Sequence, residues 1–239
     1  GVSAHYGLVA WNPGDVFHRV HVNVPADVPR DLSWLYRFVP EAARERHARA
    51  VDSLRSLGGH VDARWETVKY DPLPRPFNGW ETLVFLSDSW RGGDEGLRHL
   101  ADVHQPSRLY LVRAPITDAG LKYLAPLKTL EILHVEETQA TDAGLEVLRN
   151  LTALKELRLE GTAGGGEIGD AALKHLDGLP SLHALTVYGP KFTDAGLPNL
   201  LTIPQLRSVR LLDTKVSKEG TRAFRTKRFQ VGFTSDIPW

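Results

Sequence analysis

The stretch Thr117-Asp118-Ala119-Gly120-Leu121 recurs as Thr141-Asp142-Ala143-Gly144-Leu145 and as Thr193-Asp194-Ala195-Gly196-Leu197. A degenerate copy begins at Gly169, and weaker copies begin at Gly93 and Ser217. The six starting positions are separated by 24, 24, 28, 24 and 24 residues. Self-similarity at such a period is typical of a solenoid, in which each unit buries its apolar face against its neighbours. Because solenoids usually present a binding surface, the repeat predicts an interaction scaffold.

Each unit also contains a short stretch in which apolar residues lie two positions apart. This spacing places both side chains of a pair on one face of a strand. We therefore expect one strand per unit, with its apolar pair pointing into the solenoid. The pairs are Leu109/Leu111, Leu133/Val135, Leu157/Leu159, Leu185/Val187 and Val209/Leu211.

The recurring phrase predicts a short helix after each strand. Thr117 is suited to cap the helix, and Asp118 places negative charge at the positive end of the helix dipole. Leu121 and Leu124 share one helical face. An amphipathic pattern over residues 41–57 predicts a longer helix that ends at Gly58 and forms part of an N-terminal cap.

Further alternating pairs extend the array at both ends, at Val61/Ala63, Val84/Leu86 and Val231/Phe233. The fold class that follows is an α/β solenoid. We expect about eight parallel strands on its concave side, short helices on its convex side and a helical cap at its N-terminal end.

The chain divides into four parts. Residues 1–40 are rich in aromatic residues, and we expect them to pack on the cap or to form an interface. Residues 41–76 form the N-terminal cap with its helix and first strand, residues 77–224 the regular repeats, and residues 225–239 a C-terminal cap.

Composition excludes several classes of function. Lys plus Arg and Asp plus Glu each number 29, so no overall basic excess points to nucleic acid. The sequence contains no run of 18 apolar residues, so it predicts no membrane span. The absence of cysteine excludes disulfides and thiolate sites. Methionine is also absent, even at position 1, so we expect a processed or truncated N-terminus and leave open an upstream signal or anchor.

The segments Leu130-x-x-Leu133-x-Val135-x-x-Thr138 and Leu154-x-x-Leu157-x-Leu159-x-x-Thr162 resemble the leucine-rich repeat. With the added Thr-Asp-Ala-Gly-Leu phrase, the units look like the variant common in bacterial, planctomycete-like proteins, and are similar to the cysteine-containing repeats of F-box proteins. No F-box-like segment precedes them, so we do not carry over a role in ubiquitin ligation. The resemblance implies recognition of a macromolecule, usually a protein, and implies no reaction. In the slot that usually holds Asn or Cys, this chain has Ala114, Thr138, Thr162, Pro190 and Thr214.

Residues that alternate with the buried pairs are expected to face the concave side. One column there is Phe85, Tyr110, His134, Arg158, Thr186 and Arg210, and the next is Ser87, Val112, Glu136, Glu160, Tyr188 and Leu212. Tyr and Arg are enriched in binding hot spots. The alternative is that these positions are polar only because they are solvated. The predicted partner-binding residues are Tyr110, His134, Glu136, Arg158, Glu160, Tyr188 and Arg210.

Three features suggest other chemistry. Residues 164–169 satisfy the G-x-G-x-x-G spacing, but they coincide with the insertion that lengthens one repeat, and the next strand lacks the acidic ribose ligand. His134 and Glu136 lie on one strand face, as a metal site or an acid–base pair would require. Residues 222–229 mix basic and aromatic side chains, and a solvated last helix is the simpler interpretation.

We therefore expect a non-enzymatic scaffold with a protein partner, no nucleic acid, no cofactor and no metal. A subunit of a larger assembly is one form that such a scaffold can take. The alternatives are an accessory or regulatory subunit of an enzyme and a nucleotide- or metal-dependent enzyme. The sequence does not predict a compartment.

Overall fold

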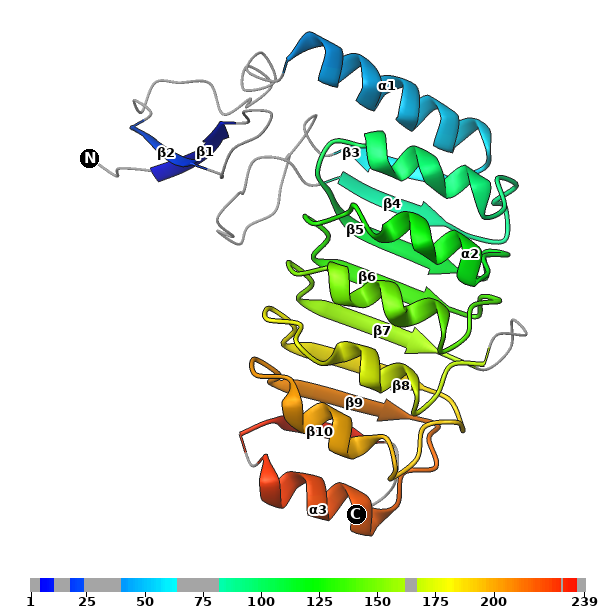
Figure 1. The fold of residues 1–239 in the computed structure, drawn as a ribbon, viewed down its shortest axis with the longest axis vertical. Coiled ribbons are helices and arrows are strands. Elements are labelled where there is room, and N and C mark those ends of the chain that lie inside the picture. Colours follow the sequence, from blue (N-terminus) through cyan, green and yellow to red (C-terminus); the bar gives the residue numbers. More distant parts are fainter. Residues whose placement is uncertain are drawn as a thin grey trace.

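The protein is described by a computed structural model that covers residues 5–10, 18–23, 40–63, 82–161, 167–228 and 230–235. Near the N-terminus, β1 (His5–Ala10) and β2 (His18–Asn23) pair as an antiparallel two-stranded sheet (Figure 1). A second sheet has eight strands. These are β3 (His60–Ala63), β4 (Thr82–Leu86), β5 (Pro106–Val112), β6 (Ile132–Glu136), β7 (Glu156–Glu160), β8 (Ala184–Tyr188), β9 (Ser208–Leu212) and β10 (Gly232–Ser235).

Each strand of the large sheet pairs with its neighbours in sequence, from β3 at one end to β10 at the other. The strands β4 to β10 are parallel, so each unit of the repeat adds one strand in the same direction. Leu109, Leu133, Leu157, Leu185 and Val209 lie opposite one another in register and are all buried. The alternating apolar pairs thus identify both the strands and their inward face.

The prediction of about eight parallel strands is wrong for β3, which runs antiparallel to β4 with Val61 opposite Val84. The chain enters β3 from a helix that ends in a tight reversal at Gly58, where φ is 90°. The N–H groups of Gly58 and Gly59 donate there to the carbonyls of Arg55 and Leu54, which returns the chain beside the helix. Apolar alternation carries no direction, so it could not reveal this reversal.

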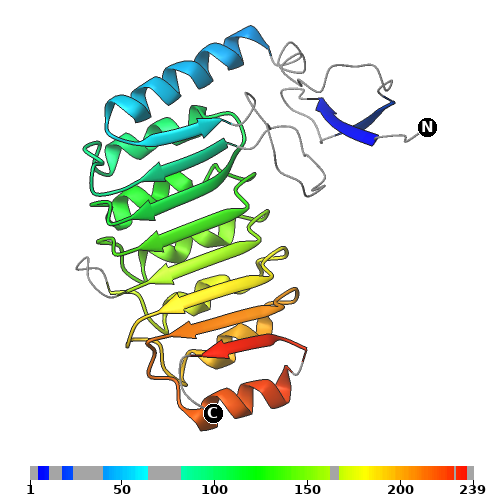
Figure 2. The same ribbon diagram turned by 180° about the vertical axis from the view of Figure 1, so that it is seen from behind.

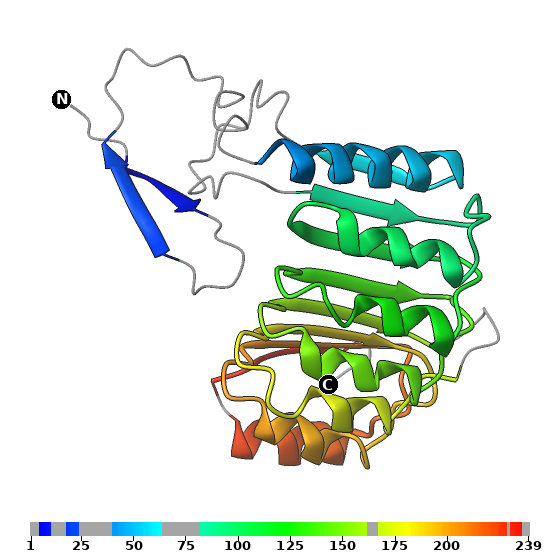
Figure 3. The ribbon, with the colours of Figure 1, turned by 45° about the horizontal axis from the view of Figure 1, so that its top comes forward.

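Helical segments cover one face of the large sheet, with α1 before its first strand and the others after later strands (Figure 1). They are α1 (Glu41–Ser56), η2 (Glu95–Asp102), α2 (Asp118–Leu121), η3 (Lys122–Leu124), η4 (Gly144–Asn150), η5 (Ala172–Leu176), η6 (Leu197–Thr202) and α3 (Lys218–Lys227), where η marks a 3₁₀-helix. Figure 3 shows them in one row, with α1 at one end and α3 at the other. The opposite face carries no helix among the described residues (Figure 2). The helix predicted over 41–57 is confirmed as α1. None of the described helices is long and apolar enough to cross a membrane.

A buried apolar layer lies between the helical row and the sheet. The leucines of the helical phrase, Leu121, Leu145, Leu173 and Leu197, are each at most 5% exposed. They belong to one continuous core with the inward strand residues and with Leu54 of α1. Fully burying a leucine contributes roughly 1.5–3 kcal/mol. The repeated apolar contacts along the array therefore stabilise the stacking of its units.

The helix starts show how consecutive units are joined. Thr117 caps α2 as predicted, because its hydroxyl accepts a hydrogen bond from the N–H of Ala119 at 3.2 Å. Asp118 does more than complement the helix dipole. Its carboxylate accepts hydrogen bonds from the N–H and the hydroxyl of Thr141 in the next unit, both at 2.7 Å. Each aspartate of the phrase therefore ties its own unit to the following one.

The same bonds recur along the array. Asp94 holds Thr117, Asp170 holds Thr193, and Asp194 holds Ser217, each through a backbone N–H and a hydroxyl. Where the following unit has Gly169 in the threonine position, Asp142 accepts instead from the N–H groups of Gly169 and Ala172, at 2.7 and 3.1 Å. We call this set of contacts the aspartate ladder.

The glycine of the phrase makes room for the ladder. A Cβ atom at Gly120, Gly144, Gly196 or Gly220 would overlap the carboxylate of the aspartate in the preceding unit. At Gly220 the three nearest atoms all belong to the Asp194 carboxylate. Threonine, aspartate and glycine in the phrase are therefore three parts of one contact between units.

The position after each strand that usually holds Asn or Cys makes different hydrogen bonds in different units. The Thr138 hydroxyl accepts from the N–H of Ala140 at 3.4 Å, as expected for a threonine that replaces asparagine. The buried Thr214 hydroxyl has no hydrogen-bond partner among the described residues. Thr162 lies outside the described residues.

The aspartate ladder predicts that the effect of Gly220→Ala on stability reverses when Asp194 is removed. In the otherwise unchanged protein, Gly220→Ala should destabilise by about 1–3 kcal/mol, because the new methyl group meets the Asp194 carboxylate. In an Asp194→Ala background the same change should become neutral or stabilising by about 0.5–1 kcal/mol, because alanine favours the helix. Denaturant unfolding of the four proteins measures both differences.

The matched control is the same cycle with Asp177→Ala, since Asp177 is an exposed aspartate. In the Asp177→Ala background, Gly220→Ala should destabilise the protein as much as it does in the wild type. An equal cost in the Asp194→Ala and Asp177→Ala backgrounds would contradict the assigned contact.

Candidate functional site on the uncovered face of the sheet

The face without helices carries the predicted columns in register. Phe85 of β4 lies opposite Tyr110, and the column continues across β6 to β9 through His134, Arg158, Thr186 and Arg210. The second column runs through Val112, Glu136, Glu160, Tyr188 and Leu212. Ser87 lies one residue beyond the end of β4. The sheet thus brings together side chains that lie 24, 25 or 28 residues apart in the sequence.

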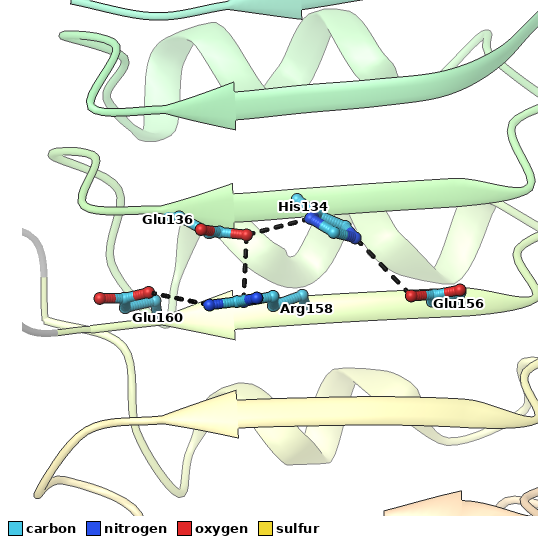
Figure 4. Close-up of polar contacts among 5 residues, drawn as sticks. All are labelled: His134, Glu136, Glu156, Arg158 and Glu160. Carbon is cyan, nitrogen blue, oxygen red and sulfur yellow. Dashed lines mark ion pairs between the residues drawn. The ribbon is translucent and has the colours of Figure 1, made fainter. Parts of the chain in front are cut away.

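Four of the predicted residues form an ionic network across β6 and β7 (Figure 4). His134 Nδ1 lies 3.0 Å from Glu136 Oε1, and Arg158 Nε lies 3.0 Å from the same oxygen. Arg158 Nη2 is 3.7 Å from Glu160 Oε2. The Glu136 and Glu160 side chains are only 13% and 12% exposed. One carboxylate therefore joins two neighbouring strands through a histidine and an arginine.

The contacts in this network differ in kind. His134 donates a hydrogen bond to Glu136, whereas Arg158 Nε is buried and not aligned for a hydrogen bond despite the short distance. The attraction between Arg158 and Glu136 is therefore mainly ionic. Partly buried pairs of this kind are screened less by salt than exposed pairs.

Glu156 is a member of this site that was not predicted from the sequence; its Oε1 lies 3.8 Å from His134 Nε2. It is 49% exposed and lies on β7. Its position two residues before Arg158 was the available signal, because residues two apart in a strand share a face.

An aromatic pair continues the first column away from the network. The rings of Tyr110 and His134 meet edge to face, with centroids 4.6 Å apart and an angle of 72°. The rings of Phe85 and Tyr110 are tilted by 42°, with centroids 6.2 Å apart. Phe85 is the exposed large hydrophobic residue of the described chain, at 36%. Tyr188 and Arg210 lie on the same face, one and two strands beyond Arg158.

The surroundings of Glu136 favour its charged form. The hydrogen bond from His134 is the largest cause of its lowered pKa, burial acts in the opposite direction, and the charge of Arg158 lowers the pKa further. The carboxylate is thus held ionised as the centre of the network.

Other candidate sites from the sequence have simpler structural settings. Among the described residues, no group of three or more His, Asp or Glu side chains is placed to hold a metal ion. In the basic run, Phe224 of α3 is buried, as the simpler interpretation expects. Phe229 and residues 164–166 lie outside the described residues.

One strand, a turn and a short helical segment per unit, with the Leu-x-x-Leu-x-Leu spacing, define a leucine-rich repeat architecture. No protein-family model matches the sequence, and no curated protein matches it significantly.

Among solved structures, the chain is similar to two internalins of Listeria monocytogenes and to a pollen receptor kinase 3. The internalin inlF has 21% identity and a TM-score of 0.41, with 57% of this chain and 43% of that chain covered. Internalin C2 has 19% identity and a TM-score of 0.47, with 66% and 74% covered. The receptor kinase has 15% identity and a TM-score of 0.43, with 78% and 91% covered. The chain thus spans less than half of inlF, and similarities this weak do not identify what it binds.

Glu136 generates a prediction about acid stability. Because the pKa of Glu136 is lowered in the folded protein, its charged carboxylate stabilises the folded state fully above pH 4.5, the ordinary glutamate value. This stabilisation is lost as pH falls through the folded-state pKa. Glu136→Gln should therefore cost about 1–2 kcal/mol at pH 7. The gap between the wild type and this variant should narrow by pH 3, as measured by denaturant unfolding at both pH values.

Glu146→Gln serves as the control, because Glu146 is 71% exposed on η4 and pairs only loosely with Arg149, at 3.6 Å. That change should cost little at either pH. A Glu136→Gln penalty that does not change between pH 7 and pH 3 would contradict the role of the charged carboxylate.

Proposed function

We propose that the chain is a leucine-rich repeat solenoid that binds a protein partner through the concave, helix-free face of its sheet. The single observation that carries the proposal is the in-register set of Tyr110, His134, Arg158 and their glutamates on a face that no described helix covers. The repeats are proposed to be of the bacterial, planctomycete-like type, on the basis of the Thr-Asp-Ala-Gly-Leu phrase.

The arrangement of this face suits recognition. Tyr and Arg are enriched in hot spots, and Arg158 is held between Glu136 and Glu160 before any partner arrives. Side chains that are already ordered lose less conformational entropy on binding. The exposed ring of Phe85 extends the surface with an apolar contact at its β4 end. Polar and aromatic groups placed in this way match a folded protein surface or an extended segment.

We propose four parts for the chain. Residues 1–40 form an aromatic-rich N-terminal segment, and residues 41–76 form the N-terminal cap, whose helix begins at Glu41 and buries Leu54 against the first unit. Residues 77–224 form the repeats and residues 225–239 the C-terminal cap. α3 crosses the boundary at 224/225, so the last helix belongs to both.

We further propose that the protein is not itself an enzyme and acts as a scaffold or as a subunit of a larger assembly. His134 and Glu136, the pair that the sequence suggested for acid–base chemistry, contact each other, and Glu136 also pairs with Arg158. These contacts therefore serve the arrangement of the face.

The test is partner capture with a triple variant of the concave face. Tyr110→Ala, Arg158→Ala and Arg210→Ala together should abolish capture of a stoichiometric partner from a lysate of the organism that encodes the chain. Truncation of a central hot-spot residue typically costs 2 kcal/mol or more, which is about 30-fold in affinity.

The control triple variant changes Lys122, Arg149 and Lys174 to Ala, three exposed cations on the helical side of the array. It should capture the partner as well as the wild type does. A partner that is retained by the concave variant but lost by the control variant would move the binding surface to the helical side and refute the proposal.

A further inference from the structure

A buried histidine joins α1 to the first unit of the array. His47 is 5% exposed, and its Nδ1 accepts a hydrogen bond from the backbone N–H of His104 at 3.0 Å. His104 lies on the connection from η2 to β5, and its carbonyl accepts from the Thr82 hydroxyl of β4 at 3.1 Å. A ring nitrogen that accepts a hydrogen bond carries no proton. Docking of α1 therefore selects a ring whose Nδ1 is deprotonated.

The surroundings of His47 oppose its protonation. Burial is the largest cause of its lowered pKa, and the charges of His104 and Arg55 lower it further. The pKa of His104 is also lowered by burial. The elements packed on α1 carry other titratable side chains, which are Glu95, Arg98, His99 and Asp102 on η2 and His60 and Asp62 on β3.

The sign of the effect follows from the direction of this shift. An unfolded histidine takes up its proton near pH 6.5, whereas the docked ring resists it. The contribution of His47 to docking is therefore complete above pH 6.5. It falls as pH drops from 6.5 toward the lower pKa of the docked ring.

The helix that His47 holds covers the end of the core. Ala50, Val51 and Leu54 of α1 are buried in the same core as Leu97 and Leu100 of η2. A second tie comes from Arg55, whose Nη2 donates to the Val61 carbonyl of β3 at 2.9 Å. Release of α1 would expose this apolar end while leaving the contacts among β5 to β9 in place.

We propose that His47 is a proton-operated latch: its neutral ring holds α1 on the first unit through the His104 N–H, and protonation of the ring breaks this bond and releases α1. This device lies at the β3 end of the array. It does not depend on the partner-binding role of the concave face.

Hydrogen exchange followed by mass spectrometry tests the latch on the full chain. After correction for intrinsic exchange, protection of residues 41–57 relative to β5–β9 should fall between pH 7.5 and pH 5.0, by about tenfold for each unit by which the pKa is lowered. In His47→Asn, whose side-chain oxygen replaces the Nδ1 acceptor without titrating, the fall should be clearly smaller. The control His183→Asn removes an exposed histidine and should behave like the wild type.

Constant protection of residues 41–57 in the wild type, or an equal fall in His47→Asn, would overturn the latch. If His47→Asn fails to dock α1 at pH 7.5, the His47 ring of the wild type is titrated by NMR. A midpoint below 6.5 would then support the latch, and a midpoint at or above 6.5 would overturn it.

Discussion

The regular stacking of this chain depends on one contact between units, in which an aspartate carboxylate binds the N–H and hydroxyl at the next helix start. Asp118 and Thr141 show it in its complete form. Hydrogen bonds to a charged acceptor contribute roughly 1.5–3 kcal/mol each, whereas a leucine contributes a similar amount without fixing an orientation. The core therefore drives the units together, and the aspartate ladder fixes how each unit sits on the last.

That fixed offset is what makes the uncovered face a defined surface. Because β5 to β9 remain in register, each outward position repeats directly opposite its counterpart one unit away. Side chains distant in sequence then meet as neighbours, such as Glu136 and Arg158. A slip of one residue would turn the Tyr110 and His134 positions inward and place buried leucines on the surface. The ladder on the helical side thus supports the ionic network on the opposite side.

Much of the fold could be predicted because its signals are local. Apolar pairs such as Leu133/Val135 identified the strands, and Gly58 identified the end of α1. The columns of the candidate site followed from the same alternation. The direction of β3, the partner of Asp118 and the contact of Glu156 with His134 could not be predicted from one segment. Each of them depends on a neighbour that only the packed array brings close.

The lengthened repeat shows how the ladder tolerates variation. This unit has Gly169 where three others have threonine, so the hydroxyl donor is missing. Asp142 still finds two donors in the N–H groups of Gly169 and Ala172. Backbone donors are available whatever the side chain, so the contact survives an irregular sequence. On the sheet side, Glu160 and Tyr188 remain opposite each other across the insertion. The register of β7 and β8 is therefore kept although this repeat is four residues longer, and the columns of the uncovered face continue across it.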